Sequence, residues 1–305
     1  MSTVRRADLT LHDAFDLFLA LREARNCEPV TLRNYRTVLQ RFAAYPFAPP
    51  MVSGITDDVL VVWLARLRRD GLSDGTVHYH QRHLYAFVNW LESRGQVERG
   101  TTRLVPRVLV QEVRRPVCSE ADLAKLLRVA GDRGPRAKWG HSSIENRLRN
   151  VAIVRVLWAT GLRRNELVTL DLDDLDLRRG EILVRHGKGK KTRVVPFDPQ
   201  AKAALAEYVM SERGREPGPL FLGRGRAPLT PDGLYQMLRD LAIRAGVAPG
   251  VHTFRRGFAS HMRRSGLAMD YTQTLMGHST ATMTRLYSAT GEEEAAISAY
   301  RARVG

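Results

Sequence analysis

Residues 252–255 read His-Thr-Phe-Arg. The side chains of His252 and Arg255 are complemented by those of four residues elsewhere in the chain. Arg163 and Lys188 lie upstream, and His278 and Tyr287 follow downstream. Together they supply two guanidiniums, one ammonium, two imidazoles and a phenol. Such a set can neutralise the charge of a phosphoryl-transfer transition state, donate a proton and provide an oxygen nucleophile. The sequence therefore indicates chemistry on a phosphodiester without a metal.

The segments around these residues resemble one known family. They are ATGLRRNELV at 159–168, GKGKKTRVVP at 187–196, HTFRRGFASH at 252–261 and LMGHSTATMTRLY at 275–287. In this order they resemble the tyrosine recombinases, which include the phage integrases and the Xer recombinases. A lone His-x-x-Arg in so arginine-rich a chain carries little weight, but six ordered elements with their local context are specific. The resemblance covers about residues 115–290 by motif.

The resemblance implies that Tyr287 is the nucleophile, which attacks a scissile phosphate and forms a 3′-phosphotyrosyl link. A free phenol is almost fully protonated at neutral pH, so the attack needs a base or strongly cationic surroundings. His252 and His278 either supply these or hydrogen-bond the phosphate oxygens. Tyr271 and Tyr300 are competing candidates, but they lie outside the motif context, and we expect both to be packing residues.

The resemblance implies that Arg163 and Arg255 bind the phosphate, because each guanidinium can donate to two oxygens at once. We expect Arg163 where one helix ends and a short one begins, and Arg255 on a helix that opens near residue 252. Lys188, at the tip of a hairpin, is the expected general acid that protonates the leaving 5′ oxygen. Lys190 and Lys191 are the alternative donors at the same hairpin.

Glu166 completes the expected site as a partner that orients the first arginine or a histidine. His252, His261 and His278 lack the spacing with cysteine or carboxylate that a zinc site requires, so we expect no metal. The chain also lacks a phosphate-binding loop for ATP. We therefore expect no cofactor.

The chain of 305 residues carries 48 lysine and arginine side chains against 32 aspartate and glutamate, a formal net charge of +16. Such an excess favours a polyanionic partner, either nucleic acid or an anionic membrane surface. No apolar run reaches about 18 residues, and the basic residues are dispersed through amphipathic segments, so a membrane role is poorly supported. Double-stranded DNA is the expected partner.

The redox and targeting signals favour the cytoplasm. Cys27 and Cys118 are the only cysteines and lie far apart, which is typical of a reduced protein without a disulfide. Arg5 and Arg6 are followed by acidic residues instead of an apolar stretch, so they do not form an export signal.

The periodicity predicts a mainly α fold with a small β-hairpin or sheet. Residues 1–98 are expected to form a helical domain, 99–117 a linker, and 118–305 a second domain. The resemblance implies that the first is a core-binding domain and the second the catalytic domain, and that the two form a clamp on DNA. Four amphipathic helices are expected in the first domain, with Thr10, Thr31 and Thr56 as N-caps of the first three.

The second domain is expected to be helical with one hairpin, whose strands are 182–185 and 192–195. Ser119 and Asp122 predict a capping box at its first helix. After Tyr287, residues 290–300 predict a short helix whose apolar stripe includes Ala296, Ile297 and Tyr300. We expect this tail to dock on a neighbouring protomer, with packing on its own domain as the alternative.

The resemblance implies that four protomers bring two duplexes together and exchange strands through a Holliday junction, with a paralogous recombinase or accessory factor as a further possible partner. A type IB topoisomerase uses the same chemistry and is the second hypothesis. A non-catalytic helical DNA-binding regulator is the third, since a motif alone does not prove activity.

Overall fold

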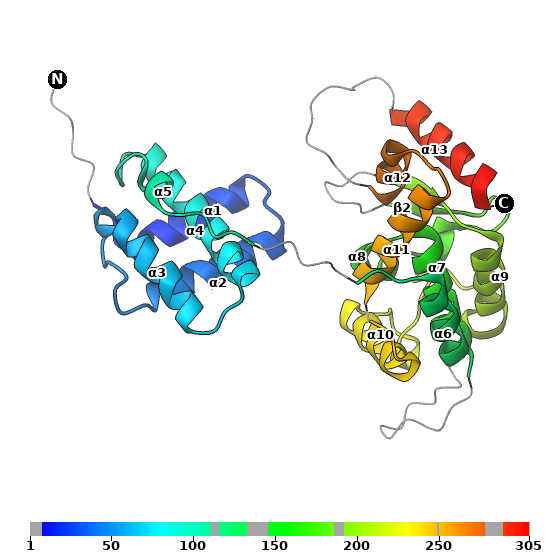
Figure 1. Ribbon diagram of the computed structural model, residues 1–305. Coiled ribbons are helices and arrows are strands. Elements are labelled where there is room, and N and C mark those ends of the chain that lie inside the picture. Colours follow the sequence, from blue (N-terminus) through cyan, green and yellow to red (C-terminus); the bar gives the residue numbers. More distant parts are fainter. Residues whose placement is uncertain are drawn as a thin grey trace. The chain divides into compact units, whose positions relative to one another are not determined.

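The computed structural model describes residues 8–110, 116–132, 146–185, 192–248, 250–277 and 289–304. By its contacts the chain divides into two compact units, Met1–Val113 and Arg114–Gly305 (Figure 1). The division falls inside the segment 99–117 that the sequence assigned to a linker. Part of that segment is structured, however, because Thr101–Leu104 is a helix (α5) and Val105 and Val108 are buried in the core of the first unit.

The first unit is helical throughout its described part. Its elements are α1 (Leu11–Ala24), α2 (Pro29–Ala43), a 3₁₀ turn (Val52–Gly54), α3 (Asp57–Arg69), α4 (Asp74–Ser93) and α5. The four longer helices each bury one apolar face, as the periodicity predicts. Aromatic rings fill the centre, where Phe18, Phe87 and Trp63 are almost completely buried. The unit therefore has a core of its own.

The helix starts of the first unit show which capping signals decided the local structure. The hydroxyls of Thr10 and Thr56 accept backbone N–H bonds at the starts of α1 and α3, as predicted. Thr31 is not a cap, because α2 already begins at Pro29. Proline suits the first helical position, since its fixed φ is already helical and its missing N–H would have no partner there.

The second unit is also mainly helical and contains one small sheet (Figure 1). Its α-helices are α6 (Glu120–Gly131), α7 (Arg147–Thr160), α8 (Arg164–Val168), α9 (Pro199–Tyr208), α10 (Pro231–Ala245), α11 (Val251–Arg264), α12 (Met269–Met276) and α13 (Ala289–Val304). Single turns of 3₁₀ helix lie at Leu172–Asp174 and Arg224–Arg226, and a π-helical turn follows α9 at Val209–Arg213. Ser119 and Asp122 form the predicted capping box at the start of α6.

Helix α7 is the centre of the second unit. It packs against α6, α9 and α11, and every residue from Ala152 to Thr160 except Arg155 is buried. A helix that is apolar on nearly all sides belongs inside a domain instead of on its surface. Helix α7 therefore positions α11, which carries part of the candidate site, and ends at the turn that carries Arg163.

The sheet has three antiparallel strands in the order β1-β2-β3: β1 (Leu175–Asp176), β2 (Glu181–Val184) and β3 (Arg193–Pro196). In the hairpin, Ile182 is opposite Val195. The sequence predicts β2 and β3 to within one residue but misses β1, which is too short to show an alternating pattern. The hairpin tip, with Lys188, Lys190 and Lys191, lies outside the described residues.

The last helix, α13, packs on its own unit, beside α12 and against β3 (Figure 1). Tyr300 is 1% exposed and lies against the ring of Phe258 at a centroid distance of 6.4 Å. Ile297 joins the same cluster, whereas the side chain of Ala296 lies outside the described set. In this single chain the tail thus packs on its own domain, the arrangement that the sequence analysis gave as the alternative; docking on a neighbouring protomer stays a prediction.

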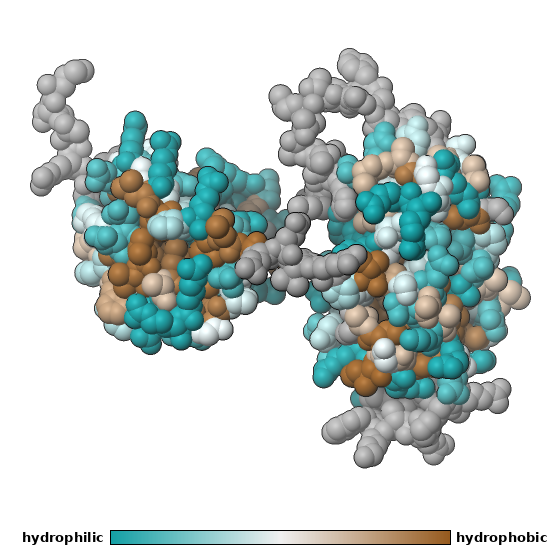
Figure 2. Space-filling model, viewed as in Figure 1, coloured by the Kyte–Doolittle hydropathy of each residue, from teal (hydrophilic) through white to brown (hydrophobic). Residues whose placement is uncertain are grey.

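Hydrophobic side chains also reach the surface of the first unit, where Figure 2 shows them gathered between hydrophilic ones. Leu17, Val30, Val61 and Val62 are exposed examples. Nowhere in the described part of the chain is a helix both long enough and apolar enough to cross a membrane.

Candidate active site

Arg163 lies in the sharp turn between α7 and α8, where the sequence places it. Gly161 ends α7 with φ 59°, a conformation that glycine adopts without strain. A side chain at this position would also approach Phe258 to 2.9 Å, so the turn needs glycine on both grounds. The turn directs Arg163 to the N-terminus of α8, where 26% of its side chain remains exposed.

Glu166 is the buried anion around which the site is built, with only 2% of its side chain exposed. It accepts hydrogen bonds from the backbone N–H of Arg163 at 2.9 Å and from Arg163 Nη1 at 2.7 Å. Arg193 of β3 donates to both carboxylate oxygens, from Nη1 at 3.1 Å and from Nη2 at 2.8 Å. Burial alone raises the pKa of Glu166, but the bonds and charge of Arg193, followed by the bonds from Arg163, outweigh it and lower this pKa to about 2.

Arg255 reaches the same place from α11. Its Nη1 donates to the carbonyl of Gly161 at 2.7 Å and its Nη2 to the carbonyl of Met276 at 2.5 Å. Burial lowers the pKa of Arg255 to about 10, and the charges of Arg163 and Arg193 act in the same direction. The guanidinium of Arg255 therefore remains protonated at neutral pH, and it lies near the guanidiniums of Arg163 and Arg193.

Three arginines from three elements meet three consecutive carbonyls at the end of α12. Arg193 Nε donates to Leu275 at 3.0 Å, Arg255 to Met276, and Arg163 Nη2 to Gly277 at 2.8 Å. The last carbonyls of a helix have no partner within it, and cations are favourable at that end. We call Arg163, Arg193 and Arg255 the arginine cluster.

The arginine cluster carries a positive excess. Three guanidiniums surround one carboxylate, Glu166, which leaves two positive charges among these four side chains. Arg163 and Arg255 each use two of their five N–H donors on the protein, so donors remain on both for a ligand. Such a cluster can bind a phosphate, and the chain that leaves it at Gly277 continues directly into His278.

The structure thus brings together Arg163, Glu166 and Arg255 of the predicted site. His252 is exposed on α11, three positions before Arg255 and so on the same side of the helix. Lys188, His278 and Tyr287 lie outside the described residues.

Arg193 is the member of the cluster that the sequence analysis missed. It lies two positions before Val195 on β3 and therefore on the same face of the strand, and Val195 is completely buried. An arginine on the buried face of a strand needs an anionic or carbonyl partner, because a charge cannot be left unpaired there. The alternation of Arg193 with the buried Val195 on one strand face was therefore the sequence signal that could have identified Arg193.

Both competing tyrosines are packing residues, as predicted. Tyr271 is half-buried against the cluster of α11, α12 and α13. Tyr300 is buried in it, and burial raises the pKa of its phenol. His261 pairs with Glu120 at 3.4 Å, and among the described residues no group of histidine, cysteine and carboxylate side chains could hold a metal.

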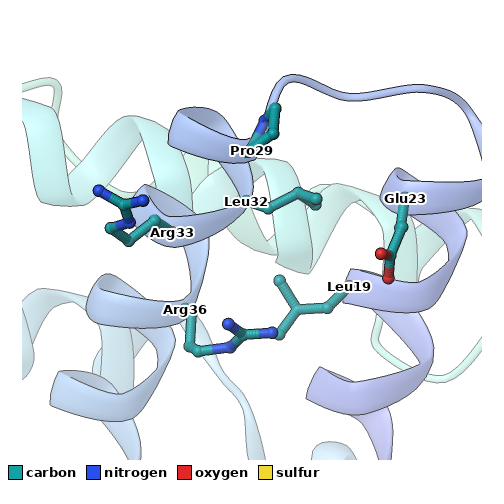
Figure 3. A pocket seen from close by; sticks show the side chains of 6 residues that line it. All are labelled: Leu19, Glu23, Pro29, Leu32, Arg33 and Arg36. Atoms are coloured by element: carbon teal, nitrogen blue, oxygen red, sulfur yellow. The ribbon is translucent and has the colours of Figure 1, made fainter.

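A separate pocket lies on the first unit between α1 and α2 (Figure 3). Leu19 and Glu23 of α1 face Leu32 and Arg36 of α2 across it. Its charged lining consists of Glu23, Arg33 and Arg36.

Comparison with known proteins agrees with this geometry. The profile of the phage integrase family matches residues 140–294, which is about half of the chain and includes every segment of the candidate site. The chain belongs to the phage integrase family, the tyrosine recombinases. The chain is thus a site-specific recombinase by family, and none of the relatives supports a topoisomerase or a non-catalytic regulator better.

Two of the relatives to which the chain is similar are tyrosine recombinases by name. The recombinase is 28% identical over 289 residues to the tyrosine recombinase XerC of Roseiflexus castenholzii, covering 91% of this chain and 89% of that one. It is 38% identical over 149 residues to the tyrosine recombinase XerD of Mycobacterium tuberculosis, covering 46% and 48% of the two chains. The structure of the Tn1549 transposon integrase with transposon right end DNA has the same fold, with a TM-score of 0.74 at 18% identity over 94% of this chain and 99% of that one.

Proposed function

We propose that this recombinase cuts and rejoins double-stranded DNA at specific sites, with Tyr287 as the nucleophile and the arginine cluster at the scissile phosphate. One observation carries the proposal. Arg163 and Arg255 come from different helices, yet they bond the neighbouring carbonyls of Gly277 and Met276, so one phosphate can contact both guanidiniums. The same carbonyls begin the segment that leads to His278 and Tyr287.

The chemistry follows from these residues. The phenol oxygen of Tyr287 attacks the phosphorus and forms a 3′-phosphotyrosyl bond, while the bond to the 5′ oxygen breaks. Lys188 gives that oxygen its proton, and Arg163 and Arg255 stabilise the charge on the non-bridging oxygens. His252 and His278 accept the phenol proton or hydrogen-bond the phosphate.

Attack by a free 5′-hydroxyl of a partner strand reverses the first step. The phosphotyrosyl bond keeps the energy of the phosphodiester, so rejoining needs neither ATP nor a metal. Exchange between two duplexes produces a Holliday junction, and we propose that four protomers carry it out, alone or with a paralogous recombinase or accessory factor.

DNA as the partner is supported by charge and by likeness. The net charge of +16 suits a polyanion, and the Tn1549 integrase was solved with its transposon end DNA. We propose that both units contact the duplex as a clamp and that the enzyme works in the cytoplasm.

The test is covalent trapping on a nicked suicide substrate, in which the cut strand end diffuses away. The wild-type protein should form a DNA adduct that survives denaturation, whereas Tyr287→Phe should bind DNA and form none. Tyr271→Phe is the matched control and should keep forming the adduct. An adduct that persists in Tyr287→Phe would falsify the assignment of the nucleophile.

A further inference from the structure

We infer that Arg193 is a positioning residue of the recombination reaction, because it holds Glu166, strand β3 and the end of α12 in one arrangement. The inference rests on the proposed function. It adds a residue to the predicted site, and that residue acts through its neighbours and not on the phosphate itself.

Each of the three side-chain nitrogens of Arg193 donates to the protein. Nη1 and Nη2 make a bidentate pair with the carboxylate of Glu166, and Nε bonds the carbonyl of Leu275. Only 10% of the side chain is exposed. The side chain of Arg163, in contrast, is 26% exposed and bonds Glu166 through Nη1 alone. Arg193 is therefore the buried support and Arg163 the accessible cation.

Gly277 shows how closely Arg193 is fitted against the end of α12. This glycine has φ 63°, and a side chain there would meet the guanidinium of Arg193 at 2.8 to 3.1 Å. The flat guanidinium thus lies against bare backbone at the residue before His278. Its position limits where the chain leaves α12.

Strand β3 connects this contact to the general acid. Arg193 is the first residue of β3 and lies five positions after Lys188 in the chain. It therefore joins three segments: the strand that follows the Lys188 hairpin, α8 with Glu166 and Arg163 at its start, and the end of α12 before His278 and Tyr287. If Arg193 is removed, these segments lose their common anchor.

Removing Arg193 also changes the charge around Glu166. The remaining cations that face this carboxylate are Arg163 and Arg255, and only Arg163 bonds it. A buried carboxylate with fewer donors binds a proton at higher pH. Once protonated, Glu166 no longer attracts and orients Arg163.

The experiment compares Arg193→Met with Arg185→Met in the suicide-substrate assay, at saturating protein and in a single turnover. Arg185 is the control from the same hairpin, because it lies directly after β2 and also pairs with a buried carboxylate, that of Asp174, although half of its side chain is exposed. Both variants should bind DNA equally. Arg193→Met should form the adduct about ten- to a hundredfold more slowly, since a misplacement of about 1 Å can cost about a hundredfold. Equal rates for the two variants overturn the inference.

A second readout separates positioning from general stability. The rate of adduct formation by Arg193→Met should begin to fall at a higher pH than that of the wild type as the solution is acidified. An unshifted acid limb means that Arg193 only supports the fold, and it overturns the inference.

Arg193→Lys keeps the proposal testable if Arg193→Met does not fold, as judged by circular dichroism. Lysine keeps the cation but cannot bond both oxygens of Glu166 and the carbonyl of Leu275 together. We expect it to cleave more slowly than the wild type; an equal rate overturns the inference. If the wild-type protein itself forms no adduct, the proposed function is wrong. The experiment thus distinguishes failure of the proposed function from failure of the inference about Arg193.

Discussion

The phenol oxygen of Tyr300 donates a 3.0 Å hydrogen bond to the carbonyl of Ala159, 141 residues away in the sequence. Ala159 belongs to the last turn of α7, where carbonyls lack partners within the helix. The bond therefore anchors the last helix to the turn that positions Arg163. This relationship connects the end of the chain with the candidate site.

The bond predicts the effect of a small change at residue 300. Tyr300→Phe removes the hydroxyl and leaves the buried carbonyl of Ala159 without this partner, which should reduce the free energy of unfolding by about 1–3 kcal/mol. Urea unfolding followed by circular dichroism measures the change. Tyr271→Phe, at a half-buried position, should reduce the free energy of unfolding by less. Equal reductions would show that the hydrogen bond of Tyr300 does not stabilise the fold.

Arg163→Lys should bind DNA but cleave it poorly. Lysine keeps the charge but cannot hold Glu166 Oε1, the carbonyl of Gly277 and two phosphate oxygens as the guanidinium can. Loss of one such transition-state donor costs about a hundred- to a thousandfold. Arg164→Lys, at the exposed neighbouring arginine, is the control and should cleave as the wild type does.

Lys188→Ala should slow cleavage of ordinary DNA by about 10²–10⁴-fold, as expected for a lost general acid. A substrate with sulfur at the 5′ bridging position should restore the rate, because a thiolate leaves without a proton. The rates of adduct formation on the two substrates are compared. Equal defects on both would transfer the role to Lys190 or Lys191.

Glu166 predicts how stability depends on pH. Its pKa is about 2 in the folded protein, below the usual value of about 4.3. Its carboxylate therefore stabilises the fold above about pH 4.3, and this stabilisation is lost as the pH falls towards 2. Glu166→Gln lacks the effect, so the difference in free energy of unfolding between the two proteins should shrink over that interval. A constant difference contradicts the assignment.

DNA affinity should fall steeply with salt. For duplex DNA, the logarithm of the binding constant against that of the salt concentration should have a slope of about −0.9 for each phosphate contacted. Titrations by fluorescence anisotropy at several salt concentrations measure it. A flat response would mean that the net charge of +16 serves another partner.

Features that depend on neighbouring residues in the sequence could be predicted. The pairing of Arg163 with Glu166 follows from their spacing of three at the start of a helix, and the Thr10 and Thr56 caps follow from their neighbours. Thr31 failed as a cap because Pro29 competes for the helix start with a stronger preference. The family motifs at 159–168 and 252–261 also predicted that Arg163 lies in a turn between two helices and that Arg255 lies on a helix.

Features that depend on tertiary packing could not be predicted. Arg193 meets Glu166 across 27 residues, and only the position of β3 beside α8 and α12 brings them together. The docking of Tyr300 likewise depends on the space between Phe258 and the end of α7. The two-residue strand β1 exists because β2 offers it a paired edge, and its own sequence carries no signal.

The burial of α7 on nearly every side has a consequence for engineering this enzyme. Each residue of an α-helix adds a rotation of about 100° and a rise of about 1.5 Å. One deletion inside α7 would turn Gly161 and Arg163 away from α12 and simultaneously carry apolar side chains out of the core. Libraries that seek new target sequences can therefore vary exposed side chains, but the length of α7 must stay fixed.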